Sequence, residues 1–546
     1  MNPPQTQSFP GWHFPNPHAN ATPDANANPD ANASPDANAN PDANAELNAA
    51  PRFDSESREN DPMALWDWLL SEEGETAIRQ AAAFPAADEL KKLTFLREKR
   101  GFSPNQAARV MEQVRLREKA AAKFGEAANR MILTPVGLEQ ATDQWIAAYK
   151  AARFPAGKAV ADICCGIGGD LAALAQNHPV LGVDRDPITA AAAKRNLKIF
   201  SSVFEQNLLK SSFNDKKQES LKKSSLKGGN CSEIDFFSEP KTANFVMAKK
   251  GQNTDQKVST FLNVKKEDFD AKTKRNSTEF QLHSVETLDA ETFLEKYPPE
   301  TFPFLHLDPD RRSDGVRTTQ MSYFEPGLDV VERLLEGREI AAVKLAPGTE
   351  VPETWKRKAS ELEWIGRDRE CRQLLVWFRK NEKMNADAPC RATILEAHSS
   401  RIHATVLGQA NEPIPVAEVP GRFLFDVDST VLAAGLEGTL ARQFGLKRIG
   451  EGSLYLTGDE AILTEGSLSC FEILRILPLD RRQLVKEIQE RQWGSVEIKK
   501  RGNVPAPEEV RKWLKFQKKG TKDAKGTLVL AQTGPKSVAI ITNRLS

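Results

Sequence analysis

The chain has 546 residues, of which 27% are charged and 40% hydrophobic, and its formal net charge at pH 7 is zero. One hydrophobic core rarely extends over such a length, so two to four domains are expected. No stretch approaches the roughly 20 consecutive apolar residues that cross a bilayer, and the N-terminus lacks the basic and then apolar pattern of a secretory signal. The composition therefore predicts a soluble globular protein rather than a membrane protein.

The cysteines are scattered along the chain and form no CxxC pair, which argues against a zinc ribbon and against a disulfide framework. This usage predicts a reducing, cytoplasmic location and no bound metal. The six cysteines are Cys164, Cys165, Cys231, Cys371, Cys390 and Cys470.

The zero net charge hides an uneven distribution of charges along the chain. Residues 20–61 hold about nine acids and two bases, whereas residues 480–546 hold about sixteen bases and seven acids. A basic end suits a polyanionic partner such as RNA. On charge alone, a solvated lysine-rich surface explains the same pattern equally well.

The first 60 residues do not have the composition of a folded domain. From Pro23 to Asn44 the unit Pro-Asp-Ala-Asn-Ala-Asn recurs with a period of six and almost no large apolar residue. Such a segment buries too little surface to offset the entropy of ordering it. Residues 1–60 are therefore predicted to form a disordered low-complexity tail.

Three kinds of region are expected after the tail. Residues 61–153 begin at Asp61-Pro62, a favourable helix start, and their apolar spacing predicts a helical domain. Residues 154–383 alternate strand and helix, which predicts a parallel sheet with helices on both faces. A polar stretch at residues 205–279 interrupts this alternation and is interpreted as a flexible insertion. Two small α/β modules are expected at residues 384–479 and 480–546.

The strongest motif is the sequence VADICCGIGGD at residues 160–170. An apolar strand leads there into a turn with Gly166, Gly168 and Gly169 and then into a helix, and glycines let a backbone pass close to a ligand. The next predicted strand ends in Asp184, an acid that can accept hydrogen bonds from both hydroxyls of a ribose. The motif therefore predicts a nucleotide-like cofactor at this turn.

A dinucleotide is one candidate for that cofactor, but its GxGxxG fingerprint needs a glycine where this chain has Leu171. Asp162 precedes the turn and Asp170 closes it, and this negative charge suits a cationic sulfonium better than a pyrophosphate. In these features the loop resembles class I S-adenosylmethionine-dependent methyltransferases. The resemblance implies a Rossmann-like α/β fold, S-adenosylmethionine as the cofactor, and Asp162, the three glycines and Asp184 as cofactor-binding residues. It also implies that Glu286, after the third strand, lies near the adenine.

A second motif follows the predicted strand Phe304–Leu307, where the chain reads Asp308-Pro309-Asp310-Arg311-Arg312. This places Asp308 at the carboxyl edge of the sheet, where ligands bind in open α/β folds. Asp308, with Pro309 and Arg311, is the candidate catalytic group, because a carboxylate can orient or deprotonate a nucleophile. Arg312 is a candidate for binding substrate phosphate. The alternative is an Asp-Pro turn whose arginines pair with nearby acids.

Amino-group methyltransferases usually carry a second proline and an aromatic residue at this position. Their replacement here removes the usual stacking platform for a flipped base. Cys164 and Cys165 lie in the cofactor loop, so they are interpreted as packing residues rather than nucleophiles. His306, within a buried strand, is interpreted as a hydrogen-bonded core residue.

Several further segments narrow the resemblance to a bacterial group of these methyltransferases, which has a helical lead-in, a ferredoxin-like segment and a THUMP-like C-terminal module. The resemblance implies RNA, with tRNA as a candidate, as the partner, and Lys499, Lys500 and Arg501 as phosphate contacts. That group usually has alanine where this chain has Asp310. The segments that carry the resemblance are residues 116–124, 134–142, 308–312, 421–425 and 499–502.

Two alternatives stay open at this point. One is methylation of a small molecule or a protein, which the missing aromatic residue after Asp308-Pro309 favours. The other is a non-catalytic RNA-binding protein with a vestigial methyltransferase fold, against which the intact glycine turn and Asp184 argue.

Overall fold

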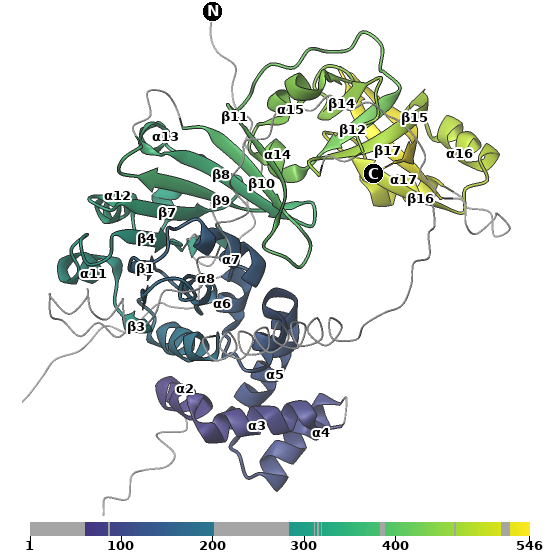
Figure 1. Cartoon of the computed structure of the whole chain (residues 1–546). Coiled ribbons are helices and arrows are strands. Elements are labelled where there is room, and N and C mark those ends of the chain that lie inside the picture. Colours follow the sequence, from purple (N-terminus) through teal and green to yellow (C-terminus); the bar gives the residue numbers. More distant parts are fainter. Residues whose placement is uncertain are drawn as a thin grey trace, which may run out of the picture. The chain divides into compact units, whose positions relative to one another are not determined.

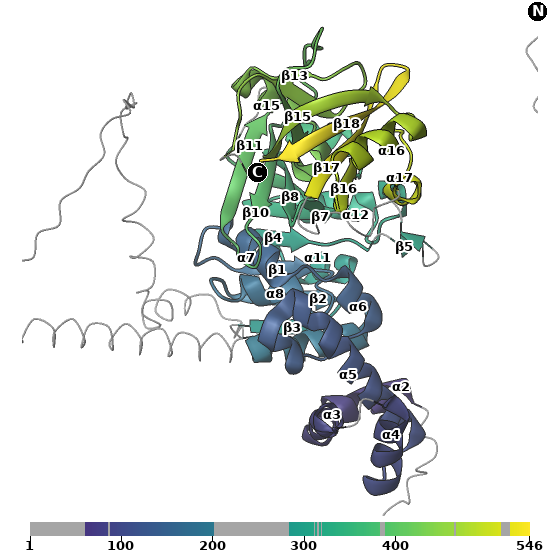
Figure 2. The same ribbon diagram turned by 90° about the vertical axis from the view of Figure 1, so that its right-hand side faces the viewer.

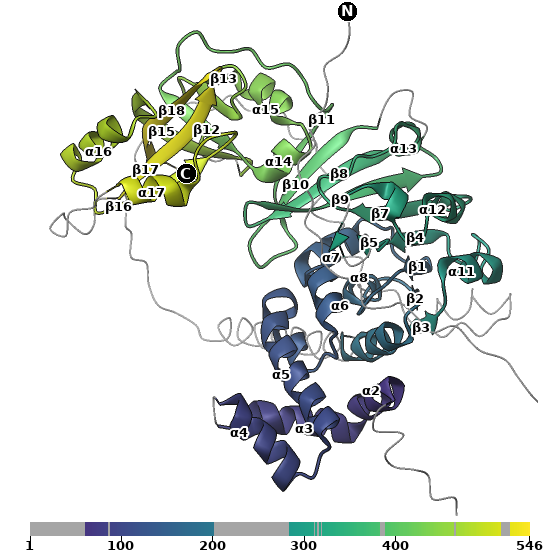
Figure 3. The same ribbon diagram turned by 180° about the vertical axis from the view of Figure 1, so that it is seen from behind.

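The structure is a computed structural model, and it describes residues 61–85, 88–200, 283–310, 312–313, 316–317, 319–382, 388–463, 466–514 and 525–545. The tail at residues 1–60 and the insertion at residues 205–279, both expected from the sequence, lie outside the described residues. Figures 1, 2 and 3 show the chain from three sides. Among the described residues, no helix combines the length and the apolar character needed to cross a bilayer.

The first described region is helical, as expected. Asp61 caps the first helix by accepting a hydrogen bond from the Met63 amide, and Ser103 and Gln106 form a capping box at the start of the longest one. Trp66, Ile78 and other buried apolar side chains join all of these helices except the last into one core, and the last packs with the sheet that follows. The helices are α2 (Pro62–Leu70), α3 (Glu72–Ala83), α4 (Glu89–Thr94), α5 (Pro104–Phe124), α6 (Pro135–Gln140) and α7 (Gln144–Ala152).

A nine-stranded sheet follows, with the order β11-β10-β8-β9-β7-β4-β1-β2-β3. Strands β3, β2, β1, β4 and β7 are parallel to one another, whereas β9 runs antiparallel to both β7 and β8. The strands are β1 (Val160–Ile163), β2 (Val180–Asp184), β3 (His283–Thr287), β4 (Phe304–Leu307), β7 (Ile340–Leu345), β8 (Glu361–Arg367), β9 (Glu370–Arg379), β10 (Cys390–Leu395) and β11 (Ile402–Gly408).

Helices cover both faces of this sheet, as Figures 1 and 3 show. Helices α7 and α8 (Gly169–Leu174) pack on one face through side chains such as Ile146 and Leu171. Helices α11 (Ala290–Lys296), α12 (Leu328–Leu335) and α13 (Glu353–Lys358) pack on the other. This three-layer arrangement confirms the Rossmann-like α/β fold predicted from the alternation of strands and helices.

The expected domain boundary near residue 384 differs from the observed one. Strands β10 and β11 were assigned to a separate module, but β10 pairs in parallel with β8 and extends the nine-stranded sheet. Both strands have the alternating or apolar sequence of any half-buried strand, and such a pattern does not specify the sheet to which a strand belongs.

The C-terminal region forms a second sheet of seven strands, with the order β13-β14-β12-β15-β18-β17-β16. Helices α16 (Arg481–Glu490) and α17 (Pro507–Trp513) cover one of its faces, where Leu484 and Val510 are fully buried (Figure 2). The strands are β12 (Phe423–Val427), β13 (Lys447–Arg448), β14 (Tyr455–Gly458), β15 (Leu468–Pro478), β16 (Ser495–Lys500), β17 (Lys525–Thr533) and β18 (Lys536–Arg544).

This sheet changes two further expectations. The boundary expected at residue 480 falls inside the sheet, because β15 pairs with both β12 and β18. Within the module expected at residues 384–479, the helix-like pattern of residues 430–444 predicts one helix, but the structure has two, α14 (Ser429–Ala433) and α15 (Glu437–Phe444). Gly435, with a φ of 66°, ends the first of them.

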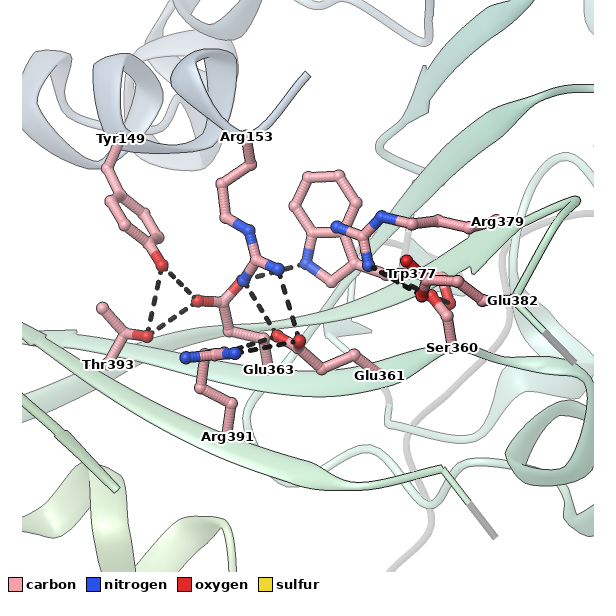
Figure 4. Close-up of polar contacts among 10 residues, drawn as sticks. All are labelled: Tyr149, Arg153, Ser360, Glu361, Glu363, Trp377, Arg379, Glu382, Arg391 and Thr393. Carbon is pink, nitrogen blue, oxygen red and sulfur yellow. Dashed lines mark hydrogen bonds and ion pairs between the residues drawn. The ribbon is translucent and has the colours of Figure 1, made fainter. Parts of the chain in front are cut away.

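A buried polar network ties α7 to the outer half of the first sheet. Glu363 of β8 is fully buried and accepts hydrogen bonds from Tyr149 (2.5 Å), Arg153 (2.6 Å), Thr393 (2.7 Å) and Trp377 (2.9 Å), as Figure 4 shows. Burial and the charge of Glu363 raise the pKa of the Tyr149 hydroxyl. Because every lone pair of this buried carboxylate has a donor nearby, the network fixes the position of α7 on the sheet.

Candidate active site

The carboxyl ends of the parallel strands open into a cavity of about 720 Å³. The chain leaves β1 to form β2 on one side and returns to form β4 on the other, so the ends of these strands flank a crevice. The cavity is lined by the loop after β1, by Asp184 at the end of β2, by residues 288–291 after β3, and by Asp308 after β4. Two motifs that lie over 120 residues apart in the sequence thus meet at one cavity, as the sequence analysis predicted.

The glycine loop approaches the cavity in a conformation that few side chains tolerate. Gly166 and Gly168 have φ angles of 57° and 85°, in the left-handed region. Gly168 precedes α8, and Gly166 and Gly169 line the cavity. The backbone amide of Gly166 donates a hydrogen bond to Asp184 Oδ2 at 2.9 Å. The loop and the end of β2 are therefore held together at one side of the cavity.

Asp184 occupies the position that the sequence predicted for it. Its other oxygen, Oδ1, accepts from the Asp186 amide at 3.1 Å, so backbone donors orient the carboxylate from two sides. Burial raises the pKa of this carboxyl group, although the two amide donors oppose that effect. Each oxygen keeps a second lone pair, with which it can accept a hydroxyl of a ligand.

Asp162 lies below the cavity rather than in its wall. Its carboxyl group is 1% exposed and Oδ1 lies 2.7 Å from His306 Nδ1. Burial raises the pKa of Asp162, and the neighbouring His306 opposes that rise. His306 is likewise buried and hydrogen-bonded, as its interpretation as a core residue required. The structure thus gives Asp162 a supporting position beneath the loop.

A second buried carboxylate, that of Asp170, belongs to the cavity lining and is ionised. Lys150 of α7 is 2% exposed and lies 2.7 Å from Asp170 Oδ1, while the Thr142 hydroxyl donates to Oδ2 at 2.7 Å. Burial alone would raise the pKa of Asp170, but the charges of Lys150, His306 and Lys344 hold it below its usual range. Burial lowers the pKa of Lys150, an effect that Asp170 opposes. The pair thus contributes a buried, ionised carboxylate to the cavity lining.

Asp308 is also anchored by a lysine. Lys344, on β7, is 7% exposed and its Nζ lies 2.5 Å from Asp308 Oδ2 and 4.0 Å from Asp170 Oδ2. Lys344 also donates to the Gln140 carbonyl at 3.4 Å, and the Gln140 amide donates to Asp310 Oδ1 at 3.1 Å. The end of α6, the end of β7 and the motif after β4 are thereby joined beside the cavity.

Lys150 and Lys344 were not among the site residues expected from the sequence. A signal for both exists in the sequence, because each is a single lysine within an apolar segment, QWIAAYKAA for Lys150 and IAAVKL for Lys344. A lysine is rarely fully buried without a carboxylate partner, so such an isolated lysine predicts a buried ion pair. The sequence does not indicate which carboxylate pairs with each lysine.

Other predicted site residues have different positions. Glu286 lies within β3 and is not part of the cavity lining. It accepts hydrogen bonds from Lys296 (2.8 Å), the last residue of α11, and from Tyr297 (2.7 Å), which follows that helix. The insertion before β3 hides the register of this strand, and Leu288 and Asp289 line the cavity instead. Arg311 lies outside the described residues. Arg312 begins the two-residue strand β5 (Arg312–Ser313), and its side chain lies outside the described part of the chain.

The basic residues proposed to contact RNA are largely occupied within the protein. Lys499 and Arg501 pair with the buried carboxylate of Asp426 at 3.5 and 3.1 Å. Arg369, from the turn between β8 and β9, approaches the same carboxylate at 3.3 Å. Lys500 is exposed and donates to the Val504 carbonyl at 3.1 Å. Of the three, only Lys500 is therefore positioned as a surface cation, and the expectation for Lys499 and Arg501 needs correction.

The two cysteines of the loop have unreactive surroundings. Burial raises the pKa of the Cys164 and Cys165 thiols well above the usual value, and the charges of nearby aspartates raise it further. A thiol that stays protonated is a poor nucleophile. Their interpretation as packing residues agrees with this environment.

The charge of the cavity fits a cationic ligand. Its lining contains eight acidic residues and one basic residue, Arg185, which itself forms an ion pair with Glu325. The volume falls within the range of about 300–1,000 Å³ that is usual for cofactor sites. The residues present thus fit S-adenosylmethionine in charge and in size. Among the residues that the structure describes, no group of three or more His, Cys, Asp or Glu side chains is arranged to hold a metal ion.

Comparisons with known proteins agree with this reading. A THUMP domain-like family matches residues 468–544, and a domain of unknown function (DUF8688) matches residues 62–120. Two uncharacterized S-adenosylmethionine-dependent methyltransferases of Mycobacterium tuberculosis, from strains CDC 1551 / Oshkosh and H37Rv, are each 24% identical to this chain over 441 residues. Each match covers 79% of this chain and 95% of the relative.

A solved structure extends the likeness to the fold. The crystal structure of a protein described as a methyltransferase, from Porphyromonas gingivalis W83, superposes with a TM-score of 0.60 at 18% identity. The match covers 87% of this chain and 99% of that one. The chain therefore has the fold of this methyltransferase structure, and its C-terminal region is similar to THUMP domains. The chain is a homologue of S-adenosylmethionine-dependent methyltransferases, which confirms the enzyme class and the cofactor expected from the glycine loop.

Proposed function

We propose that the protein transfers the methyl group of S-adenosylmethionine to RNA, with tRNA as the candidate substrate. The observation that carries the proposal is the combination of two features in one chain. One is the acidic cavity between the glycine loop and Asp308, and the other is the C-terminal sheet that resembles a THUMP domain. The first supports methyl transfer, and the second supports an RNA acceptor.

The cofactor would be held by the carboxyl ends of β1, β2 and β3. In this proposal the glycine loop at residues 166–169 lies against the methionine part of the cofactor, and Asp184 accepts hydrogen bonds from the ribose hydroxyls. Leu288 and Asp289, rather than Glu286, lie beside the adenine. Asp162 does not contact the cofactor directly in this proposal; it supports the glycine loop from beneath and is hydrogen-bonded to His306. When bound, S-adenosylmethionine supplies a methyl group that is electrophilic because it is attached to a sulfonium.

The acceptor would meet the cofactor beside Asp308 and Pro309, at the end of β4. Asp308 orients the reacting group, and Arg311 and Arg312, which follow it in the sequence, contribute positive charge to the substrate side in this proposal. The docking surface is assigned to exposed cations of the C-terminal sheet: Lys500 on β16 and Arg511 and Lys512 on α17. Such charges release counterions from the RNA backbone on binding.

The test is a comparison of modified nucleosides in total RNA from a strain with the gene and from a strain without it. We expect mass spectrometry to show one methylated nucleoside that is missing from the deletion strain and returns when the gene is restored. An Asp308→Ala gene serves as the control, because we expect it not to restore the nucleoside. If the two RNA samples carry the same methylated nucleosides, the acceptor is not RNA.

Docking is tested separately on the purified protein. Changing Lys500, Arg511 and Lys512 to alanine should weaken tRNA binding and reduce its salt dependence by up to about three phosphate contacts. The matched control removes three exposed cations, Lys91, Arg97 and Lys99, from the N-terminal helical region. If the two triple variants bind tRNA equally well, the C-terminal sheet is not the docking surface.

A further inference from the structure

An ion pair joins two sides of the cavity lining at the solvent boundary. Arg185, which directly follows β2, pairs with Glu325, and both residues belong to the lining. Their side chains are 63% and 55% exposed, whereas the side chain of Asp308 in the same lining is 22% exposed. The pair therefore lies at the mouth of the cavity rather than in its depth.

Each partner of this ion pair is anchored to a different motif of the site. Asp184, the residue before Arg185, accepts a hydrogen bond from the Gly166 amide at 2.9 Å. Glu325 exchanges two backbone hydrogen bonds with Asp310, at 2.8 and 3.0 Å, and Asp310 belongs to the motif after β4. The ion pair thus connects the segment that is proposed to bind the ribose with the segment that is proposed to meet the acceptor.

The order of the strands places this ion pair across the end of β1. Strand β1 pairs with β2 on one side and with β4 on the other, so the ends of β2 and β4 are about 10 Å apart. An arginine and a glutamate side chain together span such a distance. Burial and nearby aspartates raise the pKa of the Cys164 thiol at the end of β1, and the charge of Arg185 opposes that rise. The guanidinium is therefore close to the end of the middle strand.

The same line joins the two carboxylates between which the cofactor is proposed to bind. Asp184 is the proposed partner of the ribose, and Asp308 lies on the side where the acceptor is proposed to meet the methyl group. The ion pair crosses between the same strand ends but on the solvent side, as the exposure of its side chains shows. A ligand bound between the two carboxylates then lies under the ion pair, which has to open before the ligand enters or leaves.

We propose that Arg185 and Glu325 form a clasp that closes over bound S-adenosylmethionine and limits its exchange with solvent. The proposal rests on the proposed position of the cofactor, but it does not depend on which acceptor is methylated. Exposed ion pairs are weak, so the clasp opens readily enough for the product S-adenosylhomocysteine to leave in each cycle. While closed, it retains the cofactor during the docking of an acceptor.

The test measures how fast S-adenosylhomocysteine binds to the full-length protein and how fast it leaves, by surface plasmon resonance. Glu325→Gln removes the charge of the clasp and keeps the shape of the side chain. Because a clasp obstructs entry as well as exit, we expect both the association and the dissociation rate to rise by about two- to fivefold, as for the loss of an exposed ion pair. The dissociation constant should change by less than about twofold.

The association rate separates a clasp from a direct contact. If Glu325 contacts the ligand itself, Glu325→Gln should raise the dissociation rate alone and weaken binding in proportion, and that result would overturn the proposal. Ionic strength gives a second distinction, because salt screens exposed charges. Dissociation from the wild-type protein should become faster as salt is added, and Glu325→Gln should lose this dependence.

The matched control is Glu339→Gln, which breaks another exposed ion pair of the same sheet. Glu339 precedes β7 and pairs with Lys158, which precedes β1, and their side chains are 47% and 48% exposed. Neither residue belongs to the cavity lining. We expect this variant to bind and release the ligand at the wild-type rates. If Glu339→Gln changes both rates as much as Glu325→Gln does, the effect does not come from a clasp at the cavity.

Variants of both partners test whether the two residues act through one contact. Arg185→Gln combined with Glu325→Gln should release the ligand no faster than either single variant, because the contact is already lost in each. Exchanging the charges, by Arg185→Glu with Glu325→Arg, should bring both rates back to within about twofold of the wild-type values. Additive effects without such recovery would remove the clasp. Since no acceptor is present, a failure here leaves the proposed RNA substrate intact, and a failure of the RNA test leaves the clasp intact.

Discussion

Asp184 is the residue at which the sequence and the structure agree most closely. It ends β2, it lines the cavity, and backbone amides of Gly166 and Asp186 orient both of its oxygens. Burial raises the pKa of its carboxyl group. The ionised form is the better acceptor for ribose hydroxyls, so the proposed cofactor contact depends on the protonation of this one group.

This dependence gives a prediction for pH. As the pH falls through the raised pKa of Asp184, the carboxylate becomes protonated, and the affinity for S-adenosylmethionine should fall at a pH above the ordinary range of an aspartate. Asp184→Asn should bind more weakly at neutral pH, by about 1–3 kcal/mol, and should lack this decline. Calorimetry at a series of pH values, on samples whose folding is verified by circular dichroism, measures both effects. An equally steep decline in Asp184→Asn would assign the titration to another group.

Single residues differ in how far the sequence reveals their roles. Asp184 and Asp308 could be located because each directly follows an apolar strand, and the ends of neighbouring strands meet at one edge of a sheet. Lys150 and Lys344 could not be assigned, because an ion pair depends on distances between elements that are far apart in the chain. Lys499 and Arg501 were misread for the same reason, since their partner Asp426 is more than 70 residues away.

At the scale of elements, the turn between β8 and β9 connects the two sheets. Asp368 and Arg369 both have positive φ angles, as in the two-residue turns of hairpins. Arg369 reaches Asp426 of β12, and its carbonyl accepts from the Ser429 hydroxyl at the start of α14. Asp426 also binds Lys499 and Arg501 near the end of β16. One buried carboxylate therefore joins three elements.

Asp426→Asn should consequently lower the stability of the protein. It leaves Arg369, Lys499 and Arg501 without their shared anion, and the loss of one partner of a buried ion pair costs about 3–5 kcal/mol. Because these cations are partly exposed, the lower end of that range is expected. Denaturant unfolding measures the change, and Lys500→Ala is the control, with an expected change below about 0.5 kcal/mol. Equal stability of the two variants would contradict the anchoring role of Asp426.

The elements themselves could be predicted more reliably than their membership in a sheet. The strands β1, β2 and β4 lie where apolar runs end in glycine or aspartate, and the helix start at Asp61 follows from its capping residue. β10 and β11 belong to the first sheet because β10 pairs with β8. The local sequence of a strand does not predict its partner in the sheet. The helix α15 was likewise merged with α14, because the apolar spacing continues past Gly435.

On the scale of the whole molecule, a single cluster of buried apolar side chains extends through both sheets. It contains Leu305 of β4, Leu362 of β8, Phe425 of β12 and Val431 of α14. A second, smaller cluster holds the N-terminal helices, and it includes Ile167 of the glycine loop. The loop that is proposed to hold the cofactor therefore packs against the helical lead-in, which gives that region a direct part in shaping the cavity.

Helix α7 shows what this packing implies for motion. Two adjacent residues hold it from both sides: the Tyr149 hydroxyl donates to Glu363 of β8 at 2.5 Å, and Lys150 lies 2.7 Å from Asp170 beside the glycine loop. Local opening of α7 would break both contacts at once, so its amide hydrogens should exchange with deuterium only through global unfolding. Hydrogen–deuterium exchange mass spectrometry measures this, and full exchange of α7 within seconds under native conditions would contradict it.

The consequence concerns the route by which an acceptor enters. A helix that exchanges no hydrogens on the time scale of turnover is part of the scaffold, and Asp170 of the cavity lining, which Lys150 of this helix holds, cannot move aside for a substrate. We therefore expect an acceptor to enter past other segments that line the cavity, residues 288–291 and 325–327. Those segments should show the faster exchange, and they should be the ones whose exchange slows when an acceptor is bound.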